Sequence, residues 1–100
     1  MRIISDSRLR VASAKYPNSQ ASIQSWIKIT LLADWQSIVD VRRTFPSADS
    51  VGSLTVFNIS GNNYRLITKI NYKTRRVYIR KLLTHADYDK GRWKDDDWNR

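Results

Sequence analysis

The segment from residue 84 to residue 90, with sequence THADYDK, holds the side chains of this chain that are best suited to acid–base chemistry. His85 is the only histidine, and an imidazole exchanges a proton near neutral pH. Tyr88 follows three residues later, so one turn of helix would place both side chains on the same side. A tyrosine hydroxyl donates a hydrogen bond, or loses its proton when cations surround it. The alternative interpretation is a capped turn at the end of a strand, with Tyr88 packed and His85 exposed.

A run of positive charge precedes this segment. Between residues 61 and 86 there are seven lysines and arginines and no acidic residue: Arg65, Lys69, Lys73, Arg75, Arg76, Arg80 and Lys81. Like charges that face each other on a sheet destabilise it, and a bound anion relieves their repulsion. We therefore expect this surface to bind a polyanion, although a merely solvated sheet face is the alternative.

The composition agrees with a small globular domain that has a polyanionic partner. The chain has 100 residues, enough for one core, with 18 Lys+Arg against 9 acids and a formal net charge of +9. All nine acids are aspartate, so glutamate-based catalysis is excluded. The absence of cysteine excludes disulfides, zinc fingers, iron–sulfur sites and thiol nucleophiles, and a lone histidine argues against a histidine-based metal site. No apolar run reaches the roughly 18 residues of a membrane span, and the start turns polar too soon for a signal peptide, so we expect a cytoplasmic protein.

The short, β-branched start at residues 2–4 predicts an edge strand, and the hydrophobic spacing predicts three helices before Pro46. Ser5 or Ser7 can cap the first helix, which must stop at Pro17. The third helix is expected to begin at Asp34. The apolar positions of the three helices are, in order, Leu9, Ala12 and Tyr16; Ile23, Trp26, Ile27, Thr30 and Leu31; and Ile38, Val41 and Phe45.

After Pro46 the apolar spacing changes from about 3.6 residues to two, which predicts strands at 54–59, 64–72 and 75–84. Residues 60–63, with sequence SGNN, favour a tight hairpin turn, and residues 73–74 are expected to form the next one. Helices followed by an antiparallel meander indicate an α+β domain, with the N-terminal helices packed on one face of a mainly antiparallel sheet.

A two-residue loop at 73–74 fixes the register of the last two strands. Lys69 then faces Tyr78, Ile67 faces Arg80, and Arg65 faces Leu82. One face becomes apolar and suited to covering helices, with Leu66, Ile70, Val77, Ile79 and Leu83. The other face becomes basic, with Arg65, Lys69, Asn71, Arg76, Tyr78 and Arg80.

Four segments in order resemble the HigB-type toxins, the mRNA interferases of type II toxin–antitoxin systems within the RelE-like group. These segments are FPSAD at 45–49, VFNISGNNYRLI at 56–67, VYIR at 77–80 and THADYDK at 84–90. The resemblance implies a RelE-like domain over residues 1–91, followed by a C-terminal tail at 92–100. In that tail, Trp93 and Trp98 leave open whether it frays or packs on the body or on a partner.

The resemblance also implies an activity, namely ribosome-associated cleavage of mRNA, and neutralisation by a HigA-like antitoxin that carries a helix-turn-helix. The residues that match the active region of the family are Arg65, Arg80, His85, Tyr88 and Asp89. The remaining residues expected to bind RNA are Lys69, Arg76, Tyr78 and Lys81.

Such a toxin requires no metal and no small-molecule cofactor, because the ribose 2′-OH can attack the adjacent phosphate. Arg65 and Arg80 would hold the phosphate, since guanidinium binds it through paired hydrogen bonds. His85 would act as base or acid, Tyr88 would stack on a base or complete the pair, and Asp89 would orient His85 or cap the turn. Two other functions remain open at this point: a non-catalytic RNA-binding module, and a protein whose basic face holds an acidic partner.

Overall fold

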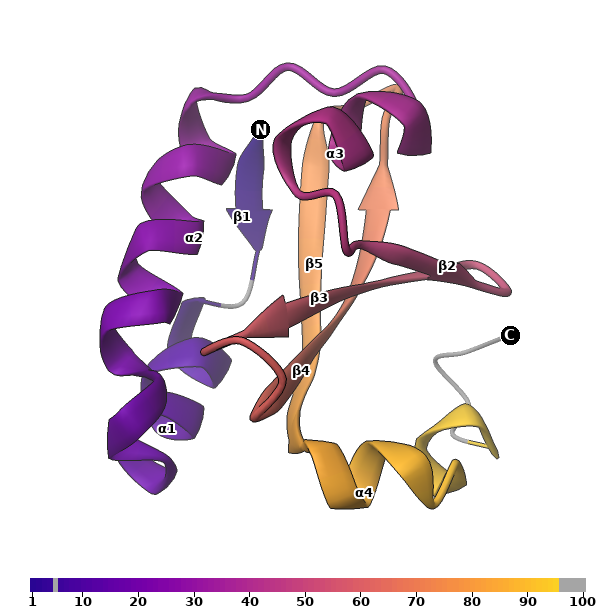
Figure 1. Ribbon diagram of the computed structural model, residues 1–100. Helices are drawn as coiled ribbons and strands as arrows, with labels where there is room; N and C mark the ends of the chain where they lie inside the picture. Colours follow the sequence, from indigo (N-terminus) through magenta and orange to yellow (C-terminus); the bar gives the residue numbers. More distant parts are fainter. Residues whose placement is uncertain (5, 96–100) are drawn as a thin grey trace.

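The computed structural model describes residues 1–4 and 6–95, and Figure 1 shows their arrangement. The helical elements are α1 (Asp6–Lys15), the 3₁₀ turn η1 (Pro17–Ser19), α2 (Gln20–Leu32), α3 (Ile38–Thr44), α4 (His85–Asp89) and the 3₁₀ turn η2 (Arg92–Asp95). The strands are β1 (Arg2–Ile4), β2 (Asp49–Val51), β3 (Leu54–Ile59), β4 (Tyr64–Asn71) and β5 (Arg76–Thr84). Within the described residues, no helix is long and apolar enough to cross a membrane. Ser5, one of the two expected helix caps, and Trp98 lie outside the described residues.

The strands form one sheet in the order β1-β5-β4-β3-β2, and all neighbouring pairs are antiparallel except β1 with β5. This confirms the expected α+β class, the edge strand at residues 2–4 and the meander after Pro46. The short strand β2 was not expected from the spacing. It pairs with β3 through Val51 and Leu54, around a turn in which Gly52 has a φ of +59°.

The helices α1, α2 and α3 cover one face of the sheet and enclose the main core. Trp26 of α2 packs edge-on against Phe57 of β3, with ring centroids 5.3 Å apart, and Trp35 stacks on the same Phe57 at 6.0 Å. Three of the expected positions on α2 are buried, but Leu31 is 54% exposed, because the buried stripe of this helix runs through Ile23, Trp26 and Thr30.

The third helix begins at Ile38, not at Asp34. Ser37 adopts an extended conformation, and the Asp40 carboxylate accepts a hydrogen bond from the backbone N–H of Gln36 at 2.9 Å. The residues before Ile38 therefore form a loop. Asp34 instead forms an ion pair with Arg75, at 3.2 Å, in the turn between β4 and β5.

The predicted register of β4 and β5 is correct at one end and wrong at the other. Lys69 faces Tyr78 as expected, but Ile67 faces Lys81 and not Arg80, and Arg65 faces Leu83 and not Leu82. The cause is a bulge, because Arg80 is an extra residue inserted opposite the step between Ile67 and Thr68. A one-residue shift moves every later side chain to the other face of the strand.

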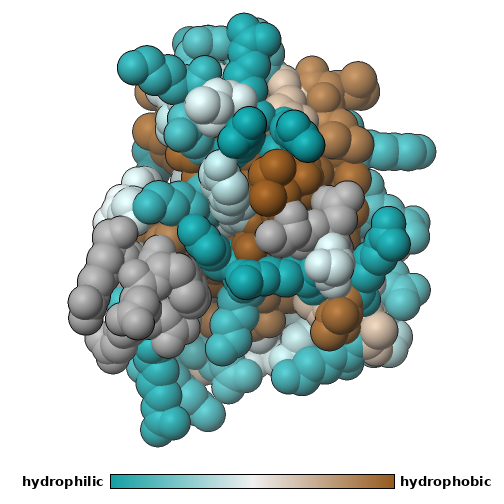
Figure 2. All heavy atoms as spheres, turned by 180° about the vertical axis from the view of Figure 1, so that it is seen from behind, coloured by the Kyte–Doolittle hydropathy of each residue, from teal (hydrophilic) through white to brown (hydrophobic). Residues whose placement is uncertain are grey.

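The bulge therefore moves Leu82 into the core under the helices and Leu83 to the opposite face. There Leu83 joins a second hydrophobic cluster with Leu54, Val56, Ile67 and Trp93. Trp93 lies in η2 and is only 3% exposed, so this part of the C-terminal segment packs on the body. The second face of the sheet is thus divided between a hydrophobic cluster and its basic residues. Seen from behind, the surface is largely hydrophilic, with hydrophobic groups emerging in places between the polar side chains (Figure 2).

Candidate active site

The turn between β3 and β4 and the short helix α4 meet at one end of the sheet. Tyr64 pairs with Thr84, so the start of β4 lies beside the end of β5, and the backbone N–H of His85 donates to the carbonyl of Asn63 at 3.0 Å. The turn needs left-handed backbone at Ser60 and Gly61, with φ values of 52° and 64°. Thr84 caps α4 by accepting the backbone N–H of Asp87 at 3.2 Å.

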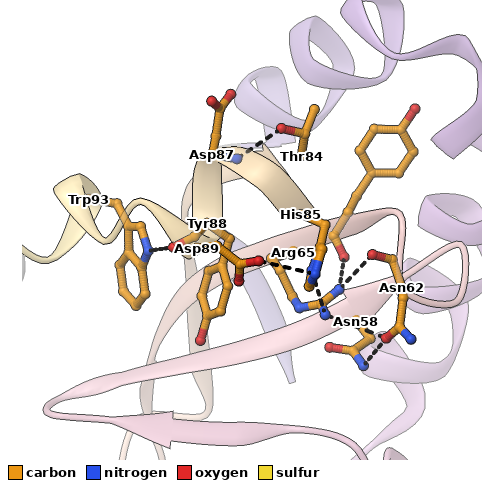
Figure 3. A network of polar contacts seen from close by, with 10 residues as sticks. Asn58, Asn62, Arg65, Thr84, His85, Asp87, Tyr88, Asp89 and Trp93 are labelled. Atoms are coloured by element: carbon orange, nitrogen blue, oxygen red, sulfur yellow. Dashed lines mark hydrogen bonds and ion pairs between the residues drawn. The ribbon is translucent and has the colours of Figure 1, made fainter.

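Arg65 is held at the centre of this junction, as Figure 3 shows. Its Nη1 donates to the carbonyls of Asn62 and Tyr64, both at 3.1 Å, and its Nη2 donates to the Asn62 side-chain oxygen at 3.4 Å and to His85 Nδ1 at 3.1 Å. Arg65 is only 8% exposed. These four contacts fix the orientation of the guanidinium and engage both of its terminal nitrogens.

Both ring nitrogens of His85 have partners. Nδ1 faces Arg65 Nη2, and Nε2 lies 3.1 Å from a carboxylate oxygen of Asp89, four residues further along α4. An arginine N–H can only donate, so Nδ1 must accept the hydrogen bond with its lone pair. The proton of the neutral ring is therefore on Nε2, where it is donated to Asp89. The His85 and Asp89 side chains are 52% and 59% exposed, so a ligand can reach them from solvent.

Tyr88 lies between Arg65 and Trp93 (Figure 3). Its ring stacks on Trp93 with centroids 5.0 Å apart, and the Arg65 guanidinium carbon lies 5.6 Å from the centroid of the Tyr88 ring. Trp93 Nε1 also donates to the carbonyl of Tyr88 at 3.0 Å. Burial, and then the negative charge of Asp49, raise the pKa of the Tyr88 hydroxyl, outweighing the opposite effect of Arg65. Of the two alternatives for this hydroxyl, the raised pKa favours the protonated hydrogen-bond donor over a tyrosinate.

The remaining expected RNA contacts lie in different places. Lys69, Tyr78 and Arg80 line a shallow pocket of about 560 Å³ together with the turn after β4. The Arg80 guanidinium carbon is 5.9 Å from the centroid of the Tyr78 ring, and its buried Nε has no hydrogen-bond partner within the described residues. Lys81 faces a different pocket, beside α1 and α4, and Arg76 lies opposite Arg2 at the pairing of β5 with β1. The structure thus gathers Arg65, His85, Tyr88 and Asp89 in one group and Lys69, Tyr78 and Arg80 in another.

Two residues that position the group around Arg65 and His85 were not predicted from the sequence to belong to the site. Asn62 holds the Arg65 guanidinium through both its backbone and its side chain, and Asn58 donates to the same Asn62 side-chain oxygen at 3.5 Å. The asparagines in this turn suggest only turn formation, although Asn62 lies three residues before Arg65. Trp93 is the second, and its role depends on tertiary packing that no local spacing indicates.

Within the described residues, no three histidine, cysteine or acidic side chains lie together as a metal site would require. The side chains that are gathered here offer a fixed guanidinium, an imidazole in a defined tautomer, a carboxylate and a protonated phenol. This combination suits proton transfer next to a negatively charged group.

A small α+β domain with this basic junction is the architecture of a RelE-like toxin. Residues 19–91 match the family described as HigB toxin, the RelE-like toxic component of a toxin–antitoxin system, and the chain belongs to that family. It is 30% identical over 93 residues to the mRNA interferase HigB of an O6 strain of Escherichia coli, with 90% of each chain covered. It is 27% identical over 92 residues to the mRNA interferase HigB of Shigella flexneri, covering 89% of this chain and 88% of the other.

Proposed function

We propose that this toxin is an endoribonuclease that cleaves mRNA bound to the ribosome in the cytoplasm, by attack of a ribose 2′-OH on the adjacent phosphate. The family and the names of its relatives support the substrate. The observation that carries the proposal is the contact between the fixed Arg65 guanidinium and the exposed His85–Asp89 pair. A charge that stabilises phosphate and a group that moves protons therefore stand next to each other.

In the proposed reaction the RNA exchanges partners with the network. The four Nη contacts of Arg65 leave its terminal nitrogens occupied, so a phosphate oxygen gains a hydrogen bond by displacing one of them. Displacing His85 has a second consequence, because it frees the Nδ1 lone pair to accept the 2′-OH proton. Asp89 continues to hold Nε2–H and stabilises the imidazolium that forms.

Tyr88 and Asn62 have supporting roles in this scheme. The Tyr88 hydroxyl keeps its proton at neutral pH, since its pKa is raised, and can therefore donate a proton to the departing 5′-oxygen but not accept one from the 2′-OH. Trp93 and Arg65 both contact the Tyr88 ring, which is why we do not assign it to stacking on an RNA base. Asn62 keeps Arg65 in place while His85 exchanges partners.

The second group supplies RNA binding. Arg80 and Lys69 face the same pocket as Tyr78, and the buried Nε of Arg80 has no hydrogen-bond partner among the described residues. A phosphate and a base can therefore bind there side by side. Arg80 is therefore proposed as a contact to the RNA backbone, away from the proton-transfer group.

Mapping mRNA 5′ ends after brief induction tests the proposal. The wild type is expected to produce new 5′ ends in register with the ribosomal reading frame, and His85→Gln is expected to produce few or none. Growth arrest without new 5′ ends would contradict the nuclease, and RNA binding that persists without cleavage would favour a binding module instead.

A further inference from the structure

The free edge of β5 is only partly covered. β1 pairs with Arg76, Val77 and Tyr78, whereas β5 continues to Thr84. Beyond this pairing, Arg8 Nη1 donates to the carbonyls of Ile79 and Arg80, at 3.3 and 3.4 Å. Within the described residues, no strand covers the edge from residue 81 to residue 83. An uncovered edge offers its backbone N–H and C=O groups to an added strand.

Two adjoining pockets border this edge and form one groove, which we call the edge groove. The first, of about 340 Å³, lies between α1 and β5, and Leu9, Val11 and Ala12 contribute to its wall. The second, of about 250 Å³, lies between the end of α1, β5 and the segment α4–η2. Both are lined by Lys15, Tyr16, Lys81 and Leu82. Val11 is 71% exposed, so an apolar side chain stands uncovered on the α1 wall.

The charge along the edge groove is strongly positive. Its cationic lining residues are Arg8, Lys15, Arg80, Lys81, Lys90 and Arg92. Among the lining residues that the structure describes, Asp87 is the single acid, and it forms an ion pair with Lys90 at 3.5 Å. A ligand of this groove must therefore be acidic.

The features of the groove favour a peptide over RNA. Phosphates would satisfy the cations but would leave the apolar α1 wall and the backbone edge unused. An extended polypeptide can use all three, through main-chain hydrogen bonds, alternate apolar side chains and acidic side chains. Tyr16 is the aromatic residue shared by both pockets, and its ring packs against Tyr64 with centroids 5.1 Å apart. This contact argues against a role for Tyr16 in stacking on an RNA base.

We propose that the edge groove receives an acidic, partly apolar segment of the antitoxin as an added β-strand along residues 81–83. The proposal rests on membership of a toxin–antitoxin family. It locates the partner on the Asp87 and Lys90 side of α4, whereas Figure 3 shows Asp87 directed away from the His85–Arg65 pair. The antitoxin segment then binds beside the candidate active site without contacting Arg65.

Two matched pairs of variants test the proposal by affinity. The antitoxin, taken from the reading frame next to the toxin gene, is titrated by calorimetry into purified wild-type toxin and variants. Val11→Asp is expected to weaken binding on the order of tenfold or more, whereas Val39→Asp, at an exposed valine of α3, leaves it unchanged. Lys15→Glu is expected to weaken binding, and Lys28→Glu on α2 is its control.

A growth assay and amide hydrogen exchange complete the test. Val11→Asp is expected to arrest growth like the wild type when expressed alone, but to escape rescue by the antitoxin. The amides of residues 81–83 are expected to gain protection from exchange in the complex. Unchanged antitoxin affinity in both Val11→Asp and Lys15→Glu, or no added protection at 81–83, overturns the proposal.

The same variants separate this proposal from the proposed nuclease. Weakened RNA binding with unchanged antitoxin binding would assign the groove to RNA and overturn the antitoxin assignment. If the wild type failed to cleave RNA but Val11→Asp still lost the antitoxin, the nuclease would be refuted and the edge groove would stand.

Discussion

Replacing Trp93 tests whether the segment after α4 braces the candidate active site. Trp93 is 3% exposed, stacks on Tyr88 at 5.0 Å and donates a hydrogen bond to its carbonyl at 3.0 Å. Truncating a buried tryptophan to alanine typically costs about 3–5 kcal/mol. Trp93→Phe keeps an aromatic ring and removes the hydrogen bond, which costs about 1 kcal/mol.

Thermal unfolding followed by circular dichroism measures these effects. For a domain of this size each kcal/mol lowers Tm by about 4–8 °C, so Trp93→Phe should lose about that much and Trp93→Ala at least about 12 °C. Arg92→Ala, at an exposed neighbour in η2, is the control and should stay near the wild type. Trp93→Ala should also lower the cleavage rate, since Tyr88 and Arg65 lose their support. A Tm of Trp93→Ala equal to that of the wild type would refute the bracing role.

Asn62, Tyr88 and Arg80 each lead to a further prediction. Asn62→Ala should lower the cleavage rate about tenfold, because it removes the side-chain oxygen that holds Arg65. Asn63→Ala should have little effect, because Asn63 holds His85 through its backbone carbonyl, which alanine keeps. The pKa of Tyr88 is raised above 10.0 in the folded protein, so unfolding releases a proton at alkaline pH and the free energy of unfolding should fall as the pH rises past 10. In a series of urea denaturations at different pH values, Tyr88→Phe should show a smaller alkaline loss of stability than the wild type. Arg80→Gln should weaken RNA binding and flatten its salt dependence while leaving the single-turnover rate at saturation nearly unchanged.

Much of the fold is predictable because hydrophobic periodicity is a local property. The strand at 54–59 is found at the expected residues, and Leu9, Trp26, Val41 and Phe57 all lie in the main core. The register of β5 is not predictable in this way. The spacing of its apolar residues is compatible with a regular ladder, and only packing on both faces of the sheet selects a bulge at Arg80 and places Leu83 beside Trp93.

The candidate site follows the same division. The segment at 84–90 shows which groups could exchange protons, and the spacing of His85 and Tyr88 on one helical turn is a local feature. Arg65 contacts both His85 and Tyr88 only because Tyr64 pairs with Thr84, and this pairing joins segments that are 20 residues apart. Arg80 lines a pocket with Lys69 and Tyr78 instead, and its membership of that second group is a tertiary feature that local spacing does not indicate.

We propose that His85, positioned by Arg65 and Asp89, transfers a proton during RNA cleavage. Single-turnover cleavage of ribosome-bound mRNA by purified His85→Gln tests it most directly, with Asp87→Asn on the other side of α4 as the matched control. His85→Gln is expected to slow cleavage by roughly 10²-fold or more with little change in ribosome binding, while Asp87→Asn cleaves like the wild type. Cleavage by His85→Gln at the wild-type rate would exclude proton transfer by His85 and leave the chemistry to Tyr88, Asp89 and the charge of Arg65.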